Sequence, residues 1–222
     1  FSAFPGLLPQ EVTSLEFLLG LDLLDNKVNL SLVYFQNSVS KKTGYKMSSY
    51  RWMAFNALDV DTSGLEGTVR VRWSPVDLAL GFSQQTSERK AGDNYELLFE
   101  ETAAFPDLML NANLTLDLSW VHAYANVEFQ YIGERTGATV NTPQTVSEAA
   151  AVQYVLDSYS LVHLTLSTYP LEIVGEKQTT TFSMTVRNLL DEAFEYPGFQ
   201  PNYSADLPGE PLQVFVGIEQ IF

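Results

Sequence analysis

Long runs in which apolar and polar residues alternate constrain the fold of this chain more than any other feature of its sequence. The clearest run covers residues 108–118, LMLNANLTLDL, in which every second residue is apolar and the residues between are mostly polar. Comparable runs cover 121–131, 181–187 and the final segment 212–222. Alternation with a period of two predicts β-strands that have one face against apolar matter and the other against water.

The length of these runs distinguishes a membrane sheet from the alternative, an ordinary half-buried sheet in a soluble sandwich. The apolar side of the run at 108–118 is six positions deep, so the strand is longer than the usual mode of about five or six residues. About ten residues tilted near 45° span roughly 24 Å, which is the height of the apolar band on a transmembrane barrel. We therefore expect lipid to be the apolar neighbour of these strands.

Composition excludes several other classes of protein. The chain has 12 Lys and Arg against 27 Asp and Glu, a net charge of −15, so a nucleic-acid partner is not expected. Cysteine is absent, so neither a disulfide framework nor thiol chemistry is available. No run of about 18 apolar residues predicts a membrane helix, since the richest segment, LEFLLGLDLL, is interrupted by Asp22.

Nine strands can be placed along the chain, and they are joined alternately by short and long connections. The short connections carry turn residues such as Asp25-Asn26 and Ser74-Pro75, and the long ones are rich in Gly, Pro, Ser, Asn and Asp. Transmembrane barrels are built in this way, with short periplasmic turns and longer extracellular loops. The expected strands are 12–24, 27–37, 60–73, 76–87, 107–118, 120–132, 157–169, 178–188 and 211–222, and the expected long loops are 38–59, 88–106, 133–156 and 189–210.

The number of strands predicts an incomplete barrel, because single-chain bacterial barrels have an even number. The predicted fold class is therefore all-β: an antiparallel up-and-down transmembrane β-barrel segment of about nine strands, incomplete without a partner chain. Residues 1–222 are expected to form one segment without a plug domain, in which residues 1–11 end an extracellular loop. An unpaired strand edge in lipid costs several kcal/mol for each orphaned backbone group. The expected partners are therefore the lipid bilayer and a polypeptide that supplies the remaining strands.

The segment 186–222, VRNLLDEAFEYPGFQPNYSADLPGEPLQVFVGIEQIF, resembles the C-terminal signature of TonB-dependent outer-membrane receptors. In that family the penultimate strand ends in Val-x-Asn-Leu-Phe-Asp, and a Tyr-containing loop, Pro-Gly-Arg and a last strand ending in Phe follow. The matching residues are Val186, Asn188, Leu189, Asp191, Pro208, Gly209 and Phe222, whereas Leu190 stands in place of Phe and Glu210 in place of Arg. Weaker similarities at 23–35, at Asn56 with Gly64-Leu65-Glu66, and at 159–166 extend the resemblance over nearly the whole chain.

The resemblance implies the C-terminal part of a receptor or transporter in the bacterial outer membrane, for a scarce nutrient such as a siderophore, cobalamin or a glycan. Such a barrel has about 22 strands around a plug, and TonB would be engaged only through the plug that this chain lacks. The family also implies that the assembly machinery reads the last strand, here Phe222, Ile218 and Val216. The alternative is a barrel piece that transports nothing and acts as a structural scaffold or interaction subunit in an outer-membrane complex.

Residues with chemistry to offer do not form a catalytic, cofactor or metal constellation in this sequence. The two histidines, His122 and His163, are both expected at lumen-facing positions of strands, and neither has the spacing of a metal motif. We therefore expect no enzyme activity, no cofactor and no metal site, and we expect the acidic loop 189–210 to be solvated rather than to bind Ca²⁺. Charges on the polar side of strands need a wet or protein-filled interior. The lumen-facing candidates, expected to contact a plug or alternatively to select a solute, are Glu66, Arg70, Arg72, Asp117, His122, Glu128 and Arg187.

Overall fold

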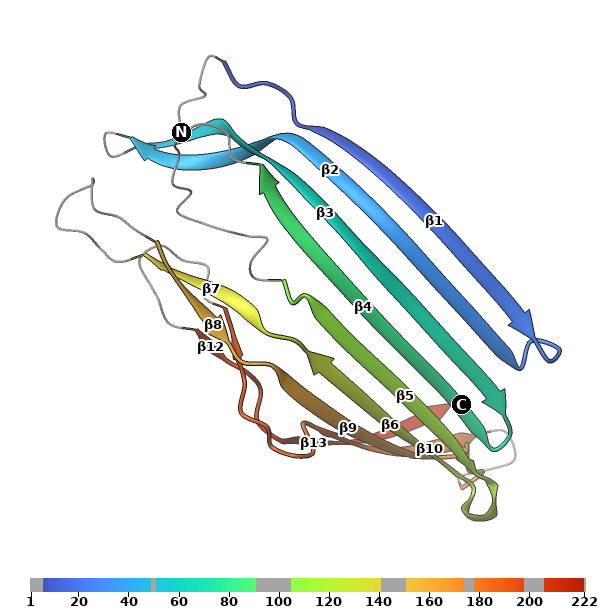
Figure 1. Ribbon diagram of the computed structural model, residues 1–222. Helices are drawn as coiled ribbons and strands as arrows, with labels where there is room; N and C mark the ends of the chain where they lie inside the picture. The colour runs from blue at the N-terminus through green and yellow to red at the C-terminus, as the bar shows by residue number, and fades with distance from the viewer. Residues whose placement is uncertain are drawn as a thin grey trace.

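A computed structural model of the chain describes residues 6–48, 51–90, 105–140, 151–173, 178–197 and 206–221. The described residues form one nine-stranded antiparallel sheet and two small two-stranded sheets (Figure 1). The strands of the large sheet, in spatial order, are β1 (Glu11–Leu23), β2 (Val28–Ser48), β3 (Arg51–Trp73), β4 (Val76–Lys90), β5 (Leu108–Leu118), β6 (Ala123–Ile132), β9 (Tyr159–Thr168), β10 (Thr179–Arg187) and β13 (Gln213–Ile221). The small sheets pair β7 (Arg135–Val140) with β8 (Ala151–Leu156) and β11 (Glu195–Tyr196) with β12 (Leu207–Pro208). No helix in the described part of the chain is long and apolar enough to cross a membrane.

The nine strands of the large sheet correspond one to one with the nine strands expected from the sequence, which confirms the predicted fold class. The sheet is not closed: β1 and β13 are its two outer strands, and every residue of β1 is exposed. Short connections lie at one end of the strands and long connections at the other (Figure 1). The first short connection is a tight turn in which Leu24, Asp25 and Asn26 all have positive φ, and Lys27 N donates to Leu24 O at 3.1 Å.

The expectation that residues 38–59 form a loop is wrong, because β2 and β3 continue as a hairpin to Ser48 and Arg51. The register shifts between Val39 and Lys42, where Lys41 has a φ of 58°, and pairing then resumes. Backbone pairing does not depend on lipid, so the hairpin continues where the alternation of apolar residues has stopped. Two other expected loops contain strands for the same reason: 133–156 includes β7 and β8, and 189–210 includes β11 and β12.

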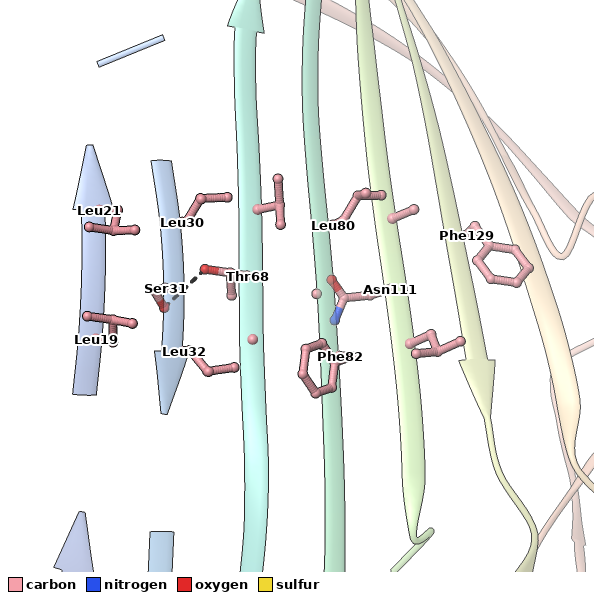
Figure 2. Close-up of a pocket in the computed structure, with 15 residues that line it drawn as sticks. Leu19, Leu21, Leu30, Ser31, Leu32, Thr68, Leu80, Phe82, Asn111 and Phe129 are labelled. Carbon is pink, nitrogen blue, oxygen red and sulfur yellow. Dashed lines mark hydrogen bonds between the residues drawn. The ribbon is translucent and has the colours of Figure 1, made fainter. Parts of the chain in front are cut away.

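The pairing register places the apolar side chains of the large sheet on one face. Residues directly opposite each other in an antiparallel pair lie on the same face. One row of such residues crosses the sheet as Leu21, Leu30, Val69, Leu80, Ala112 and Phe129, and the next as Leu19, Leu32, Gly67, Phe82 and Leu110. A groove of about 620 Å³ runs between the two rows (Figure 2). A side chain at position 67 would meet the Phe82 ring at 2.2 Å, so only glycine leaves room for this ring.

The opposite face of the same strands is polar. One of its rows crosses from β1 to β9 as Asp22, Asn29, Arg70, Ala79, Asn113, Glu128 and His163. A second row contains Arg72, Asp77, Thr115, Asn126, Thr165 and Thr185. Carboxylates, guanidinium groups and amides are tolerated on a spanning strand only where they meet water or protein. This polar face is therefore the candidate functional surface.

Candidate functional site on the polar face of the sheet

The polar face near the short turns is held by an ion pair and a chain of hydrogen bonds. Arg70 Nη2 lies 2.8 Å from Asp77 Oδ2, and its Nε lies 3.2 Å from Oδ1, so the pair is bidentate. Arg72 donates to Asn29 Oδ1 at 3.0 Å, and Asn29 Nδ2 in turn donates to Asp22 Oδ1 at 2.5 Å. The side chains of Arg70 and Asp77 are 51% and 37% exposed, so water screens much of their attraction.

A carboxylate and three rings form a second polar group at this end of the strands. The Tyr169 hydroxyl, in the connection after β9, donates to Asp117 of β5. This hydrogen bond raises the pKa of Tyr169 above its ordinary value. The Tyr169 ring lies 4.6 Å from the Tyr124 ring and meets His122 edge-on at 5.8 Å, measured between centroids. The contacts join β5, β6 and the β9–β10 connection.

Hydrogen-bonded amide and hydroxyl groups occupy much of the middle of the polar face. Asn126 Nδ2 donates to Asn113 Oδ1 and to Thr115 Oγ1, both at 2.9 Å. Gln130 Nε2 donates to Glu128 Oε1 at 2.6 Å. Most of these side chains therefore already have a partner within the sheet, and Glu128 is the carboxylate among them.

Six of the seven lumen-facing candidates lie on strands and share the polar face: Glu66, Arg70, Arg72, Asp117, Glu128 and Arg187. The expectation that His122 lies on a strand is wrong. It follows the 3₁₀ turn Ser119–Val121 with a φ of 52°, and its N–H donates to Ser119 O at 3.2 Å. The chain reverses here, and a left-handed residue is needed to end the turn, so β6 starts one residue later, at Ala123.

Val216 and Ile218, two residues of the candidate assembly signal, lie on the apolar face of β13 and are 77% and 69% exposed. Their pairing partners on β10 are Met184 and Phe182. The third residue, Phe222, lies outside the described residues.

The connection after β10 folds back onto the polar face, a position that its sequence does not predict. Phe194 stacks on Tyr159 with centroids 4.4 Å apart, and both belong to a buried cluster with Leu161 and Ile132. Tyr159 and Ile132 are paired, and they lie on the same face as Glu128 and His163. The connection therefore covers this face of the sheet at one end of β6 and β9 instead of extending away from the strands.

Arg135 also holds this connection in place. Its guanidinium lies 4.9 Å from the centre of the Tyr159 ring and donates through Nη2 to Glu195 O at 2.9 Å. The side chain is only 6% exposed, and its Nε has no hydrogen-bond partner among the described residues. Arg135 is thus committed mainly to the connection and to Tyr159.

Asn188 of the signature motif holds the two ends of this connection together through hydrogen bonds to its backbone. It is 2% exposed, its Nδ2 donates to Glu192 O at 2.9 Å and Glu210 O at 3.0 Å, and its Oδ1 accepts from Glu192 N at 2.9 Å. His163 Nδ1 accepts from Asn188 N at 3.0 Å. The sequence signal that pointed to this group was the motif itself, but the motif does not say where the loop lies.

A cleft of about 770 Å³ opens beside the connection. Its ionisable lining consists of Arg135, Asp157, Tyr159, Asp191, Glu192, Glu195, Asp206 and Glu210. At its rim Tyr196 donates to Glu210 Oε2 at 3.2 Å, and burial together with this carboxylate raises the pKa of Tyr196. Within the described ranges, no group of three or more His, Cys, Asp or Glu is placed to hold a metal ion.

An open antiparallel sheet whose strands match the bilayer in length, with one apolar and one polar face, defines a segment of a transmembrane β-barrel. The chain matches the family model described as TonB dependent receptor-like, beta-barrel, over residues 1–189, and it belongs to that family. It is accordingly a segment of a TonB-dependent receptor-like β-barrel of the bacterial outer membrane.

Solved structures of receptors share this fold. The pyoverdine receptor FpvA of Pseudomonas aeruginosa PAO1, bound to pyoverdine, is 15% identical with a TM-score of 0.73, over 96% of this chain and 30% of that chain. The FrpB iron transporter of Neisseria meningitidis (F3-3 variant) is 15% identical with a TM-score of 0.76, over 99% and 33%. The ferric-catecholate import receptor Fiu of E. coli K12 is 16% identical with a TM-score of 0.66, over 96% and 28%.

The chain spans about a third of the length of these receptors. None of the curated protein sequences matches it. The relatives named here are receptors and transporters rather than enzymes.

Proposed function

We propose that this chain is the C-terminal portion of a receptor that imports a scarce nutrient across the outer membrane, and that the nutrient is a ferric siderophore. Cobalamin and glycans are the competing cargoes. The remaining strands and the plug come from another polypeptide segment, and TonB acts through that plug. The cargo proposal draws support from the pyoverdine, iron and ferric-catecholate receptors that share the fold.

The observation that carries the proposal is the division of one open sheet into two faces. The apolar face suits lipid, and the outer strands β1 and β13 each leave one edge without a partner among the described residues. In lipid those edges need partner strands. The polar face then surrounds the lumen, where Glu66, Arg70, Arg72, Asp117, Glu128 and Arg187 stand to meet a plug.

Uptake measurements test the cargo. A strain without the gene is given radiolabelled ferric siderophore, cobalamin or an oligosaccharide, with and without functional TonB. We expect this strain to lose only the TonB-dependent uptake of ferric siderophore, and we expect the intact gene to restore that uptake. Loss of cobalamin or oligosaccharide uptake instead would identify that compound as the cargo. Unchanged uptake of all three in this strain, together with co-purification of the chain and an outer-membrane partner from the parent strain, would favour the scaffold alternative.

The incomplete barrel has its own test. The isolated chain in detergent is expected to remain heat-unmodifiable on gels, because nine strands leave two open edges. A closed, heat-modifiable barrel formed by the chain alone would contradict the need for partner strands.

We also propose that Val216, Ile218 and Phe222 form the signal read by the assembly machinery. Val216 and Ile218 present branched apolar side chains on the exposed apolar face of the outer strand. Deleting Phe222 is expected to lower the amount of receptor in the outer membrane more than it lowers the stability of receptor already assembled. Undiminished surface levels would contradict this role.

A further inference from the structure

We propose that Asn188 and Asp191 form a register clamp, a pair of side chains that fixes how far the last strand, β13, slides along β10. The clamp goes beyond transport: it selects the register in which the barrel is completed. Its evidence is a set of hydrogen bonds that join the end of β10 to the residues just before β13.

The sequence of β13 does not fix its own register. A slip of one residue would turn Val214, Val216 and Ile218 from the apolar to the polar face, and burial of one face strongly opposes that. A slip of two residues keeps every side chain on its face. Another interaction must therefore distinguish the native register from registers displaced by two.

The clamp makes this distinction at the point where the two strands meet. Arg187, the last residue of β10, pairs with Gln213, the first residue of β13. Asn188 Nδ2 donates to Glu210 O at 3.0 Å, and Leu212 N donates to Asp191 Oδ1 at 2.9 Å. A slip of two residues moves the backbone by about 6.8 Å, at roughly 3.4 Å per residue, and breaks both hydrogen bonds.

The clamp is anchored to strands that precede β13 in the chain. Asn188 N donates to His163 Nδ1 at 3.0 Å, and Leu189 N donates to Val162 O at 2.7 Å, so both residues are tied to β9. Asp191 N donates to Asn188 O at 2.9 Å. The clamp can therefore form on β9 and β10 and then receive β13 as the last strand to pair.

A second contact brings the incoming segment to the clamp. Gly209 N donates to Phe194 O at 2.7 Å, and a side chain at position 209 would meet the Phe194 ring at 2.3 Å. Phe194 itself is fixed by stacking on Tyr159. This close approach requires glycine and delivers Glu210 to Asn188.

Disulfide trapping reads the register directly, and the natural chain has no cysteine to interfere. Thr185 lies opposite Phe215 on the polar face, so Thr185→Cys with Phe215→Cys reports the native register. Thr185→Cys with Gly217→Cys or Gln213→Cys reports slips of two residues. Directly opposite residues have Cβ atoms about 4.5–5.5 Å apart, and the diagonal neighbours are about 7–8 Å apart. Only the directly opposite pair is close to disulfide geometry.

The clamp variants are tested in the receptor assembled in the outer membrane. Asn188→Asp keeps the acceptor for Glu192 N but removes both donors, and Asp191→Ala removes the acceptor for Leu212 N. We expect each to raise the ratio of slipped to native cross-links about tenfold, as the loss of one or two hydrogen bonds implies. The controls, expected to stay native, are Asp191→Asn, which keeps the acceptor, and Glu192→Ala, since Glu192 takes part through its backbone.

Variants that fail to assemble are tested by rescue. The engineered disulfide between Thr185→Cys and Phe215→Cys fixes the native register covalently, so we expect it to restore assembly of the Asn188→Asp variant. Failure of this disulfide to restore assembly would overturn the proposal, because the clamp would then serve loop stability alone. Unchanged cross-link ratios in both assembled clamp variants would also overturn it.

Discussion

The two faces of the large sheet share the same strands but are stabilised in different ways. On the apolar face, Leu114 lies between Leu78 and Val127, and it needs only an apolar neighbour. On the polar face, Asn126 donates to two named acceptors, Asn113 and Thr115, at 2.9 Å each. Any apolar side chain is compatible with a lipid neighbour, whereas a hydrogen bond requires particular atoms at particular distances. The apolar face should therefore be sensitive to polarity, and the polar face to geometry.

The largest expected effect comes from placing a charge in the apolar face. Leu114→Arg should cost about 2–4 kcal/mol of folded stability near the bilayer midplane. The matched control is Asn113→Arg, one residue away on the polar face. There Glu128 lies directly opposite and can form an ion pair with the new guanidinium group. Urea unfolding in lipid vesicles measures both. Equal destabilisation at the two positions would mean that the faces do not differ in environment.

The division into faces is also what made the strands predictable. Lipid forces the alternation over the full depth of the membrane, so all nine strands were visible in the sequence. Beyond the membrane nothing forces it: the segment 40–48, SKKTGYKMS, continues β2 by pairing with β3 although it does not alternate. Strands in the expected loops were missed for that reason.

The polar face was predictable by residue type but not by partner. Alternation placed Arg70 and Glu128 on the right side of their strands, yet it does not reveal that Arg70 meets Asp77. The register clamp was visible only as a motif, because its contacts join residues 188–191 to 210–212 across a long connection. The alternation of apolar and polar residues continues through the turn at 119–122, so it wrongly predicts that His122 lies on a strand. In the structure His122 ends the 3₁₀ turn, and β6 begins one residue later, at Ala123.

A smaller effect is expected when one methylene is added on each face of β6. Asn126→Gln keeps the amide but moves it away from Asn113 and Thr115, and should cost about 1 kcal/mol for weakened hydrogen bonds. Val127→Ile adds a methylene on the apolar face and should stay within about 0.5 kcal/mol, because lipid adapts to its shape. Unfolding in vesicles compares the two variants. A larger cost for Val127→Ile would mean that this face packs against protein.

The smallest effect is expected at the ion pair between Arg70 and Asp77, and it tests whether water reaches the polar face. Arg70 and Asp77 are bidentate but remain well exposed, so their attraction is screened by water. A double-mutant cycle with Arg70→Gln and Asp77→Asn should give a slight coupling at low salt, and none near about 1 M salt, where the screening length is about 3 Å. Unfolding in vesicles of the completed barrel with its plug removed supplies the reference, and the same cycle in the complete receptor supplies the comparison. Coupling that survives high salt only in the complete receptor would place the plug over this pair. Coupling that survives in both would contradict a water-filled polar face.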